Sequence, residues 1–171
     1  MKKQSFGKIL SFLPALAMLA AIFSFSAQTG TQSGGLSQTA SQWLVAHWRA
    51  LTSGDCSPDA IALQAKAIEF WVRKGAHMTE YALLCLSVSL PFGVYRIRPK
   101  LRIPLTPLIC AAVAAGDEFH QSFVAGRGPS VRDVGIDTLG ALCALGLLEL
   151  ICHLIRRHKP TQKKKADKLI V

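Results

Sequence analysis

Residues 105–121 read LTPLICAAVAAGDEFHQ, an apolar run that ends in two adjacent carboxylates, a histidine and an amide. A helix built from this stretch and entering lipid would carry Asp117 and Glu118 into the hydrocarbon before it left. Placing a carboxylate in that environment costs roughly 2.5–3.5 kcal/mol on insertion scales. The two acids are therefore expected to face protein, water or a ligand, and other parts of the chain should supply their partners.

The composition is typical of a membrane protein. Half of the 171 residues are hydrophobic and 18% are charged, and the mean hydropathy is +0.31, which is too apolar for an ordinary soluble domain of this size. The net charge of +10 could suit nucleic acid, but fourteen of the twenty Lys and Arg lie in three clusters between apolar runs. Membrane topology explains that spacing better, so we expect no nucleic-acid partner. The clusters are Lys2, Lys3 and Lys8; Arg96, Arg98, Lys100 and Arg102; and Arg156, Arg157, Lys159, Lys163, Lys164, Lys165 and Lys168.

Four apolar segments have lengths that suit, or nearly suit, a bilayer span. The first covers residues 6–25. A cleaved signal peptide is the alternative there, because Ser24-Phe25-Ser26 offers small residues at cleavage-like spacing. The other three spans are predicted at 75–90, 104–125 and 134–155. Pro91 is expected to end the second.

Residues 26–74 form an outer loop in this prediction. Its beginning, 26–35, is rich in Ser, Thr, Gln and Gly and is typical of a polar loop. Residues 37–51 carry two tryptophans, a histidine and two leucines at near-helical spacing, which predicts a helix that lies at the membrane interface or packs on the outer ends of the spans. These residues are Trp43, Leu44, His47, Trp48 and Leu51. Ser57-Pro58-Asp59 begins another helix, which can run into the second span.

All three basic clusters fall on one side of the membrane if the four spans alternate. Lys and Arg then number fourteen inside and six outside, an orientation that the positive-inside rule favours. The expected fold class is an all-α membrane protein: a bundle of four transmembrane helices with cytoplasmic N- and C-termini and one or two short interfacial helices in the outer loop. Residues 1–155 form the transmembrane domain and 156–171 a basic cytoplasmic tail. The expected location is the plasma membrane, with several passes.

This topology brings polar groups from three spans to one depth near the outer surface. On the second and third spans they fall within arcs of about 120° and about 100°, so each set shares one helix face. On the fourth, Gly140 and Ala144 have small side chains that allow close helix approach. The predicted cluster comprises Arg73, Lys74, His77, Glu80, Tyr81, Asp117, Glu118, Gln121, Arg127, Ser130, Asp133 and Asp137.

The residues leave three uses of this cluster open. It can be an outward pocket that binds a ligand, because ionisable residues within a membrane are functional candidates by default. It can be an ion-pair network that only sets helix register. It can also be an active site for a lipid head group, with His77 as the base and Glu80, Asp117 or Glu118 as the acid or orienting group.

We expect neither a metal nor a cofactor. Di-iron bundles use Glu-x-x-His motifs on facing helices, whereas this chain has His77-x-x-Glu80 in the reverse order and Glu118-x-x-Gln121 with an amide in place of the histidine. His120 lies off the face of Gln121 and is expected to be a packing or interface residue. The five cysteines show neither paired nor metal-ligand spacing.

Three stretches carry longer motifs: RKGAHMTEY at residues 73–81, DEFHQSFVAGRGPSVRD at 117–133 and SFSAQTG at 24–30. The first two resemble the R-K-x-A-H-x-x-E-Y and D-E-x-x-Q-x-F-x-x-G-R-x-x-S-x-x-D signatures of the VanZ-like family of bacterial integral membrane proteins. The third is similar to the Ser/Gln-rich segment that closes their first span. Asp137 departs from the pattern, which usually has Asn there, and an extra acid could alter the charge of the pocket or pair with Arg132.

The resemblance, over about residues 10–155, implies a role in the cell envelope. The family is named for a protein associated with resistance to teicoplanin, a glycopeptide antibiotic with a lipid tail. We therefore predict a non-enzymatic protein whose pocket binds an amphiphilic envelope component or a lipoglycopeptide. Its expected partners are membrane lipids and such an envelope precursor or lipoglycopeptide, and its oligomeric state is left open. The bases expected to hold an anionic head group are Arg73, Lys74, Arg127 and Arg132.

Overall fold

The computed structural model describes residues 7–52 and 56–167, with side chains as far as residue 158. Throughout these residues, helices are joined by short turns and no β-strand occurs. Five helices follow a short helical turn at residues 7–10: α2 (Leu13–Ser26), α3 (Gly30–Leu51), α4 (Pro58–Val94), α5 (Pro99–Gln121) and α6 (Val131–Asp167). The predicted all-α class is confirmed.

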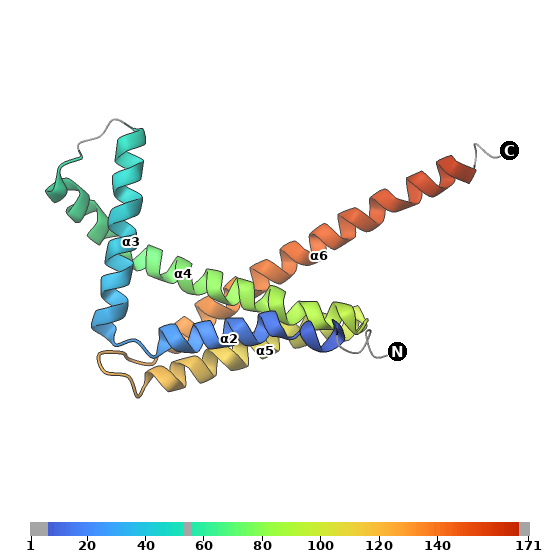
Figure 1. Ribbon diagram of the computed structural model, residues 1–171, viewed down its shortest axis with the longest axis horizontal. Helices are drawn as coiled ribbons and strands as arrows, with labels where there is room; N and C mark the ends of the chain where they lie inside the picture. The colour runs from blue at the N-terminus through green and yellow to red at the C-terminus, as the bar shows by residue number, and fades with distance from the viewer. Residues whose placement is uncertain (1–6, 53–55, 168–171) are drawn as a thin grey trace.

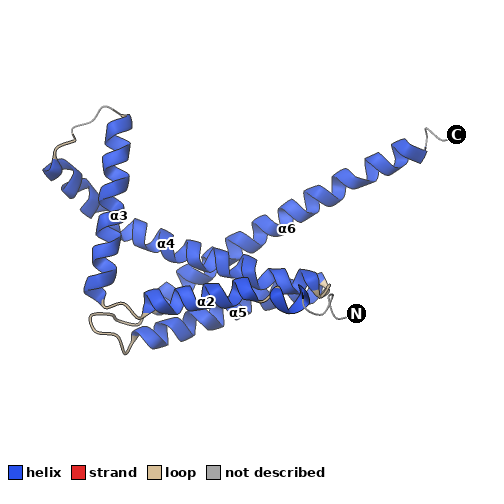
Figure 2. Cartoon of the chain, in the orientation of Figure 1, coloured by secondary structure: helices blue, strands red, loops and turns tan. Residues whose placement is uncertain are grey.

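Helix α4 is the centre of the fold, because it packs against α2, α3, α5 and α6. Its second half runs beside α2 and α5, whereas α3 stands across one end of this bundle (Figure 1). Helix α6 crosses α4, and its C-terminal half projects away from the other helices (Figure 2). The predicted helix start at Pro58 is confirmed, and the helix runs without a break from the outer region into the bundle.

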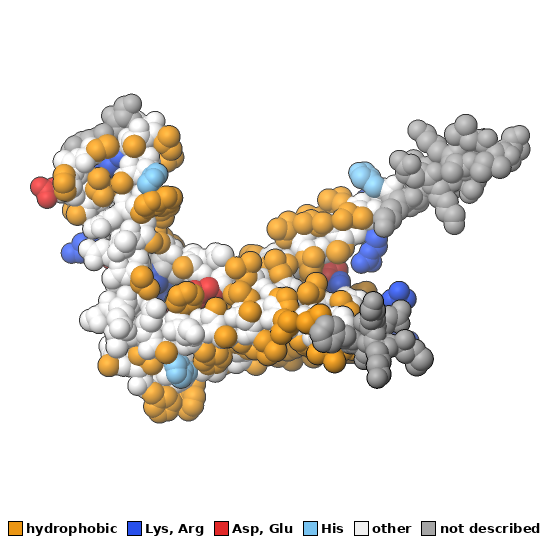
Figure 3. Space-filling model, viewed as in Figure 1, with side chains coloured by type: hydrophobic (Ala, Val, Ile, Leu, Met, Phe, Trp, Pro, Cys, Tyr) orange, Lys and Arg blue, Asp and Glu red, His pale blue; other side chains and the backbone are white. Residues whose placement is uncertain are grey.

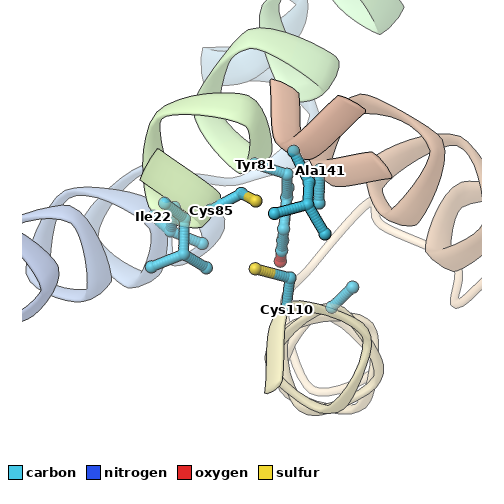
Figure 4. Close-up of a cluster of buried hydrophobic side chains, with 8 residues drawn as sticks. Ile22, Tyr81, Cys85, Cys110 and Ala141 are labelled. Carbon is cyan, nitrogen blue, oxygen red and sulfur yellow. The ribbon is translucent and has the colours of Figure 1, made fainter. Parts of the chain in front are cut away.

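The core lies where α2, α4, α5 and α6 meet. Apolar positions three or four residues apart place one stripe of each helix inside, as helical periodicity requires. Figure 4 shows Cys85 and Cys110 pointing into the same space between α4 and α5. All five cysteines are free. The core residues are Ile22, Tyr81, Leu84, Cys85, Cys110, Ala114, Ala141 and Leu145.

Helices α4 and α6 lie in close contact at Gly140. A Cβ placed there would overlap the backbone of Met78 and lie 2.8 Å from its Cα atom. The prediction that small residues of this span permit close helix approach is confirmed at Gly140. Towards the other end of the bundle, an ion pair between Arg102 and Glu149 joins α5 to α6.

Two of the described helical segments are long and apolar enough to cross a membrane, namely Gly7–Ser26 and Val131–His158. Both expose large hydrophobic side chains, and Figure 3 shows hydrophobic side chains covering much of the visible bundle and of α6. Exposed apolar surface of this extent marks contact with another apolar phase. The chain is a membrane protein. Passage of α4 and α5 through the bilayer as well stays a prediction.

Helix α3 begins earlier than predicted, within the stretch 26–35 that was expected to be a polar loop. The Thr29 hydroxyl accepts a hydrogen bond from the Gln32 N–H (3.3 Å), and the Gln32 side chain accepts one from the Thr29 N–H (3.0 Å). This capping box satisfies two donors at the helix start and offsets the weak helix propensity of the glycines that follow.

The ends of α4 and α5 also differ from prediction. Pro91 is buried inside α4, which ends only at Val94, because a proline so close to the helix end removes a single backbone hydrogen bond. Helix α5 ends at Gln121 instead of 125, because the following loop folds back onto the start of α3. There the Ala125 carbonyl accepts a hydrogen bond from the Gly30 N–H (3.0 Å).

Described members of two predicted basic clusters lie at the end of the bundle opposite α3, whereas Arg73, Lys74 and Arg127 lie beside α3. The turn between α4 and α5 holds Arg96 and Arg98, and the ammonium group of Lys8 lies 5.4 Å from the centre of the Tyr95 ring. Lys2, Lys3 and Lys168 of the predicted clusters lie outside the described residues, and the side chains of Lys159, Lys163, Lys164 and Lys165 lie beyond the last described side chain. The expected basic tail begins within α6, whose helix continues to Asp167.

Candidate functional site: a polar pocket at the foot of α3

The buried side of the site continues the face of α5 that packs against the other helices of the bundle. Cys110 and Ala114 continue along this face into Asp117 and Gln121, whose side chains are 2% and 5% exposed. The Gln121 amide donates a hydrogen bond to Oδ2 of Asp117 (3.0 Å). Oδ1 of Asp117 is buried and has no hydrogen-bond partner among the described residues. Asp117 is thus an interior residue of the bundle.

Arg127 ties the loop after α5 to the end of α2. Its guanidinium donates from Nε to the Gln28 carbonyl (3.1 Å), from Nη2 to the Phe25 carbonyl (3.2 Å) and from Nη1 to Oε1 of Gln121 (3.0 Å). Carbonyls near a helix C-terminus lack their usual partner within the helix. The Phe25 carbonyl also accepts from the Gln28 N–H (3.2 Å), and Arg127 gives it a further donor. Burial lowers the pKa of Arg127 and Asp117 raises it again, and an arginine remains protonated in either case.

The start of α6 is held by two carboxylates. Oε2 of Glu118 accepts a hydrogen bond from the Ser130 N–H (2.7 Å), directly before the first helical residue. Asp133, in the first turn of α6, pairs with the ammonium group of Lys74 on α4 (2.6 Å). Negative charge near a helix N-terminus is favourable, so these contacts also orient α6 against α4 and α5.

Two adjoining cavities open beside these contacts. The first has a volume of about 200 Å³ and the second about 210 Å³. Both share the side chains of Ser33, Arg73, His77 and Arg127. The first is also lined by Gly30, Lys74, Gln121, Gly126, Gly128 and Asp133, and the second by Phe25, Gln28, Leu36, Ser37, Ala40, Val72, Ala76 and Glu80. Their walls differ, because the first is mainly polar and the second mainly apolar.

The charges on the walls favour an anion. The first cavity has three fixed cations, Arg73, Lys74 and Arg127, and one carboxylate, Asp133. Lys74 is already paired and Arg127 already donates to three oxygens. Arg73 forms no hydrogen bond or ion pair with any residue that the structure describes. It is the cation most available to a ligand.

His77 and Glu80 stand together on the wall of the second cavity. Nδ1 of His77 lies 3.7 Å from Oε2 of Glu80, one helical turn away. His77 also faces the first cavity. The pair lies at the boundary between the two cavities.

Seven of the twelve predicted cluster residues line a cavity and five do not. The lining residues are Arg73, Lys74, His77, Glu80, Gln121, Arg127 and Asp133. Tyr81 and Asp137 are buried, Asp117 supports Gln121, and Glu118 and Ser130 hold the start of α6. Of the predicted cluster residues on α5, only Gln121 lines a cavity. The cluster combines a supporting network with an open pocket, and a role in binding stays a prediction for each residue.

Three expectations for neighbouring residues can be compared with the contacts. Among the described side chains no ion pair joins Asp137 to Arg132, and the Arg132 guanidinium instead lies 5.9 Å from the ring centre of Phe70. His120 contacts Ser26 through Nδ1 (3.1 Å) and the edge of Phe23, as expected of a packing residue. No group of three or more His, Cys, Asp and Glu within residues 7–52 and 56–158 is arranged to hold a metal ion.

Sequence reasoning missed the contribution of the α2–α3 junction. Gln28, Gly30 and Ser33 line the cavities, and a side chain at Gly30 would overlap the carbonyl group of Gly126. Gly126 itself has a φ of +74°, which favours glycine. The polar and glycine residues that begin at Ser26 could have indicated this contribution, but this stretch was interpreted only as a loop.

A comparison with protein families agrees with this arrangement of motifs. The model of the VanZ/LLP1 family matches residues 10–153, which contain α2 to α5, most of α6 and every residue of both cavities. Searches of curated proteins and of solved structures return no match. The chain belongs to the VanZ/LLP1 family.

Proposed function

We propose that this is a multi-pass plasma-membrane protein whose outward pocket binds an anionic amphiphile of the cell envelope. The observation that carries the proposal is Arg73, a cation that lines both cavities and has no partner among the described residues. Arg127 stands beside it with its charge only partly compensated. A guanidinium binds carboxylate and phosphate oxygens through paired N–H groups. The ligand is an envelope precursor, a phospholipid or a lipoglycopeptide of the teicoplanin type.

The proposed topology has four spans with both termini in the cytoplasm. Its support is the position of one basic cluster and of Lys8: the turn between α4 and α5, with Arg96 and Arg98, and Lys8 lie at the end of the bundle opposite the cavities. Positively charged loops are retained in the cytoplasm. The pocket at the foot of α3 then opens on the outer side of the membrane.

Binding is tested by thermal unfolding of the purified full chain with phosphatidylglycerol, undecaprenyl diphosphate or teicoplanin, each compared with phosphatidylcholine. A ligand at one hundred times its Kd stabilises the folded state by about 2.7 kcal/mol. We expect at least one anionic amphiphile to raise the unfolding temperature while phosphatidylcholine does not. A folded protein that responds to none of the three would refute the proposal.

Replacing Arg73 by glutamine is expected to abolish that stabilisation without loss of folded protein. The side chain is exposed and supports no contact between described residues, so its loss removes only a ligand contact. Lys66→Gln is the matched control, because it removes one positive charge from the same helix at an exposed position away from both cavities. Equal loss of binding in both variants would indicate a general charge effect. In cells, Arg73→Gln is expected to change sensitivity to teicoplanin and Lys66→Gln is not.

A second candidate function is catalysis on a lipid head group. It is favoured by the His77–Glu80 pair, whose Nδ1 and Oε2 atoms lie 3.7 Å apart. A small side-chain rotation would bring the carboxylate within hydrogen-bond distance, where it can orient the imidazole as a general base. The expected result is that wild-type protein changes a component of a bacterial lipid extract, measured by mass spectrometry, and that His77→Gln does not. If the wild type changes nothing in the extract, binding remains as the function of the pocket.

A further inference from the structure

Helix α3 has two chemically different faces. Ser37, Ser41 and Val45 are buried against α4. Beside this contact, an arc of the helix carries large apolar side chains, and Trp43 and Trp48 are 60% and 62% exposed. The remaining arc holds glycine and the side chains of Gln, Thr and Arg. An amphipathic helix with tryptophan on its apolar side is typical of the membrane interface. The apolar face comprises Leu36, Trp43, Leu44, Trp48 and Leu51.

The direction of α3 suits a helix that lies flat on a bilayer. It stands across the end of the bundle formed by α2, α5 and the second half of α4 (Figure 1). Hydrophobic side chains lie along one edge of α3, and this edge is on the same side of α3 as the bundle (Figure 3). If the bundle spans the bilayer, the apolar face of α3 is directed at the surface of the outer leaflet.

The second cavity opens on this same face. Leu36 and Ala40 of α3 form part of its wall, together with Phe25 at the end of α2 and Ala76 of α4. Basic and acidic side chains are visible in the corner between α3 and the bundle (Figure 3). A path from the outer leaflet thus leads past an apolar wall to Arg73, which borders both cavities.

We propose that α3 rests on the outer leaflet and that an anionic membrane lipid enters the second cavity sideways from that leaflet. Its head group reaches Arg73 and Arg127, while the start of its acyl chain remains between Phe25, Leu36 and Ala76. This route rests on the proposed function for its ligand, whereas the position of α3 rests on the proposed topology and on no ligand. It assigns the polar cavity to the head group and the apolar cavity to the chain.

The position of α3 is tested with single-tryptophan variants of the full chain in nanodiscs. One variant keeps Trp43 (Trp48→Phe, Trp71→Phe) and one keeps Trp48 (Trp43→Phe, Trp71→Phe). The control carries Gln42→Trp, with all three native tryptophans replaced by phenylalanine. Phosphatidylcholine brominated near the top of its acyl chains is expected to quench the fluorescence of Trp43 and Trp48 and to leave the control nearly unchanged. Equal quenching in both single-tryptophan variants and the control overturns this placement, as does the absence of quenching at Trp43 and Trp48. If quenching is absent and the protein is a dimer, the apolar face of α3 is assigned to contact with a second copy of the chain.

The route is tested by filling the second cavity. Ala76→Leu adds bulk to its wall, whereas Ala67→Leu adds the same bulk at an exposed site of α4 that lines neither cavity. Leucine adds three carbons to the wall, and a single extra methylene in a hydrophobic pocket already costs about tenfold in affinity or more. We therefore expect Ala76→Leu to weaken binding of phosphatidylglycerol by about tenfold or more and Ala67→Leu to have no effect. Arg73→Gln should weaken it as well.

The outcomes separate the route from the proposed function. If Arg73→Gln abolishes binding and Ala76→Leu does not, the head group binds at Arg73 as proposed, but entry of the lipid through the second cavity is refuted. A wild-type protein that does not bind phosphatidylglycerol overturns entry of an anionic membrane lipid, whatever the tryptophans report. The broader proposal, that the pocket binds an amphiphile, is then tested by whether undecaprenyl diphosphate or teicoplanin raises the unfolding temperature.

Discussion

Gly140→Ala is expected to destabilise the folded protein by roughly 3 kcal/mol, at the upper end of the range for overpacking. The added methyl group would overlap the carbonyl oxygen of Met78 and lie 2.8 Å from its Cα and 3.0 Å from its carbonyl carbon. These are backbone atoms in the middle of α4, which cannot rotate away as a side chain can. Helices α4 and α6 must separate to admit the methyl group, and the Lys74–Asp133 pair would separate with them.

The measurement is the free energy of unfolding in detergent, together with the yield of monodisperse protein. Gly146→Ala is the matched control, because Gly146 also lies in α6 but has no heavy atom within 4 Å of its added Cβ. This control is expected to be as stable as the wild type or more stable by up to about 1 kcal/mol, since alanine is the better helix former. Equal losses in the two variants would show that the contact at Met78 is not tight.

Arg127→Lys is expected to destabilise the protein by roughly 2–4 kcal/mol although it conserves the charge. The guanidinium donates at once to the carbonyls of Phe25 and Gln28 and to the side chain of Gln121. Hydrogen bonds to a charged group contribute about 1.5–3 kcal/mol each, with less for a half-buried residue. An ammonium group cannot reproduce the planar fork that reaches three separate acceptors.

The loss is measured by thermal unfolding in detergent without added lipid, so that it does not depend on any ligand. Arg132→Lys serves as the control, because Arg132 is exposed and its recorded contact is with the ring of Phe70. A lysine retains a cation over the ring, so we expect a change of at most about 0.5 kcal/mol. If Arg127→Lys is as stable as Arg132→Lys, the loop does not depend on this arginine.

Much of the candidate site could be predicted because its residues repeat at helical spacing. His77 and Glu80, three residues apart, were expected on one face and stand 3.7 Å from each other. Gly140 was expected at a close helix contact and is found at one. Spacing along one helix determines which side chains share a face, so such inferences need no knowledge of the neighbouring helices.

The direction of each face could not be predicted in the same way. Asp117 and Gln121 share a face as expected, but that face is the packing stripe of α5, so Asp117 lies inside and only Gln121 reaches the first cavity. The angle between two side chains on a helix does not say which neighbour covers them. The polar stretch 26–35 was misinterpreted for a related reason, because a capping box and a backbone contact between Gly30 and Ala125 outweigh its composition.

The sequence by itself determined the membrane class, the apolar segments and the polar residues that recur on three helices, because hydropathy and helical period are properties of neighbours in the chain. Only the tertiary structure decided that Lys74 is paired with Asp133, that Arg127 supports the end of α2, and that Arg73 has no partner among the described residues. These outcomes depend on distances between residues of different helices. Such distances are set by how the helices cross, and the spacing of residues along a single helix does not contain them.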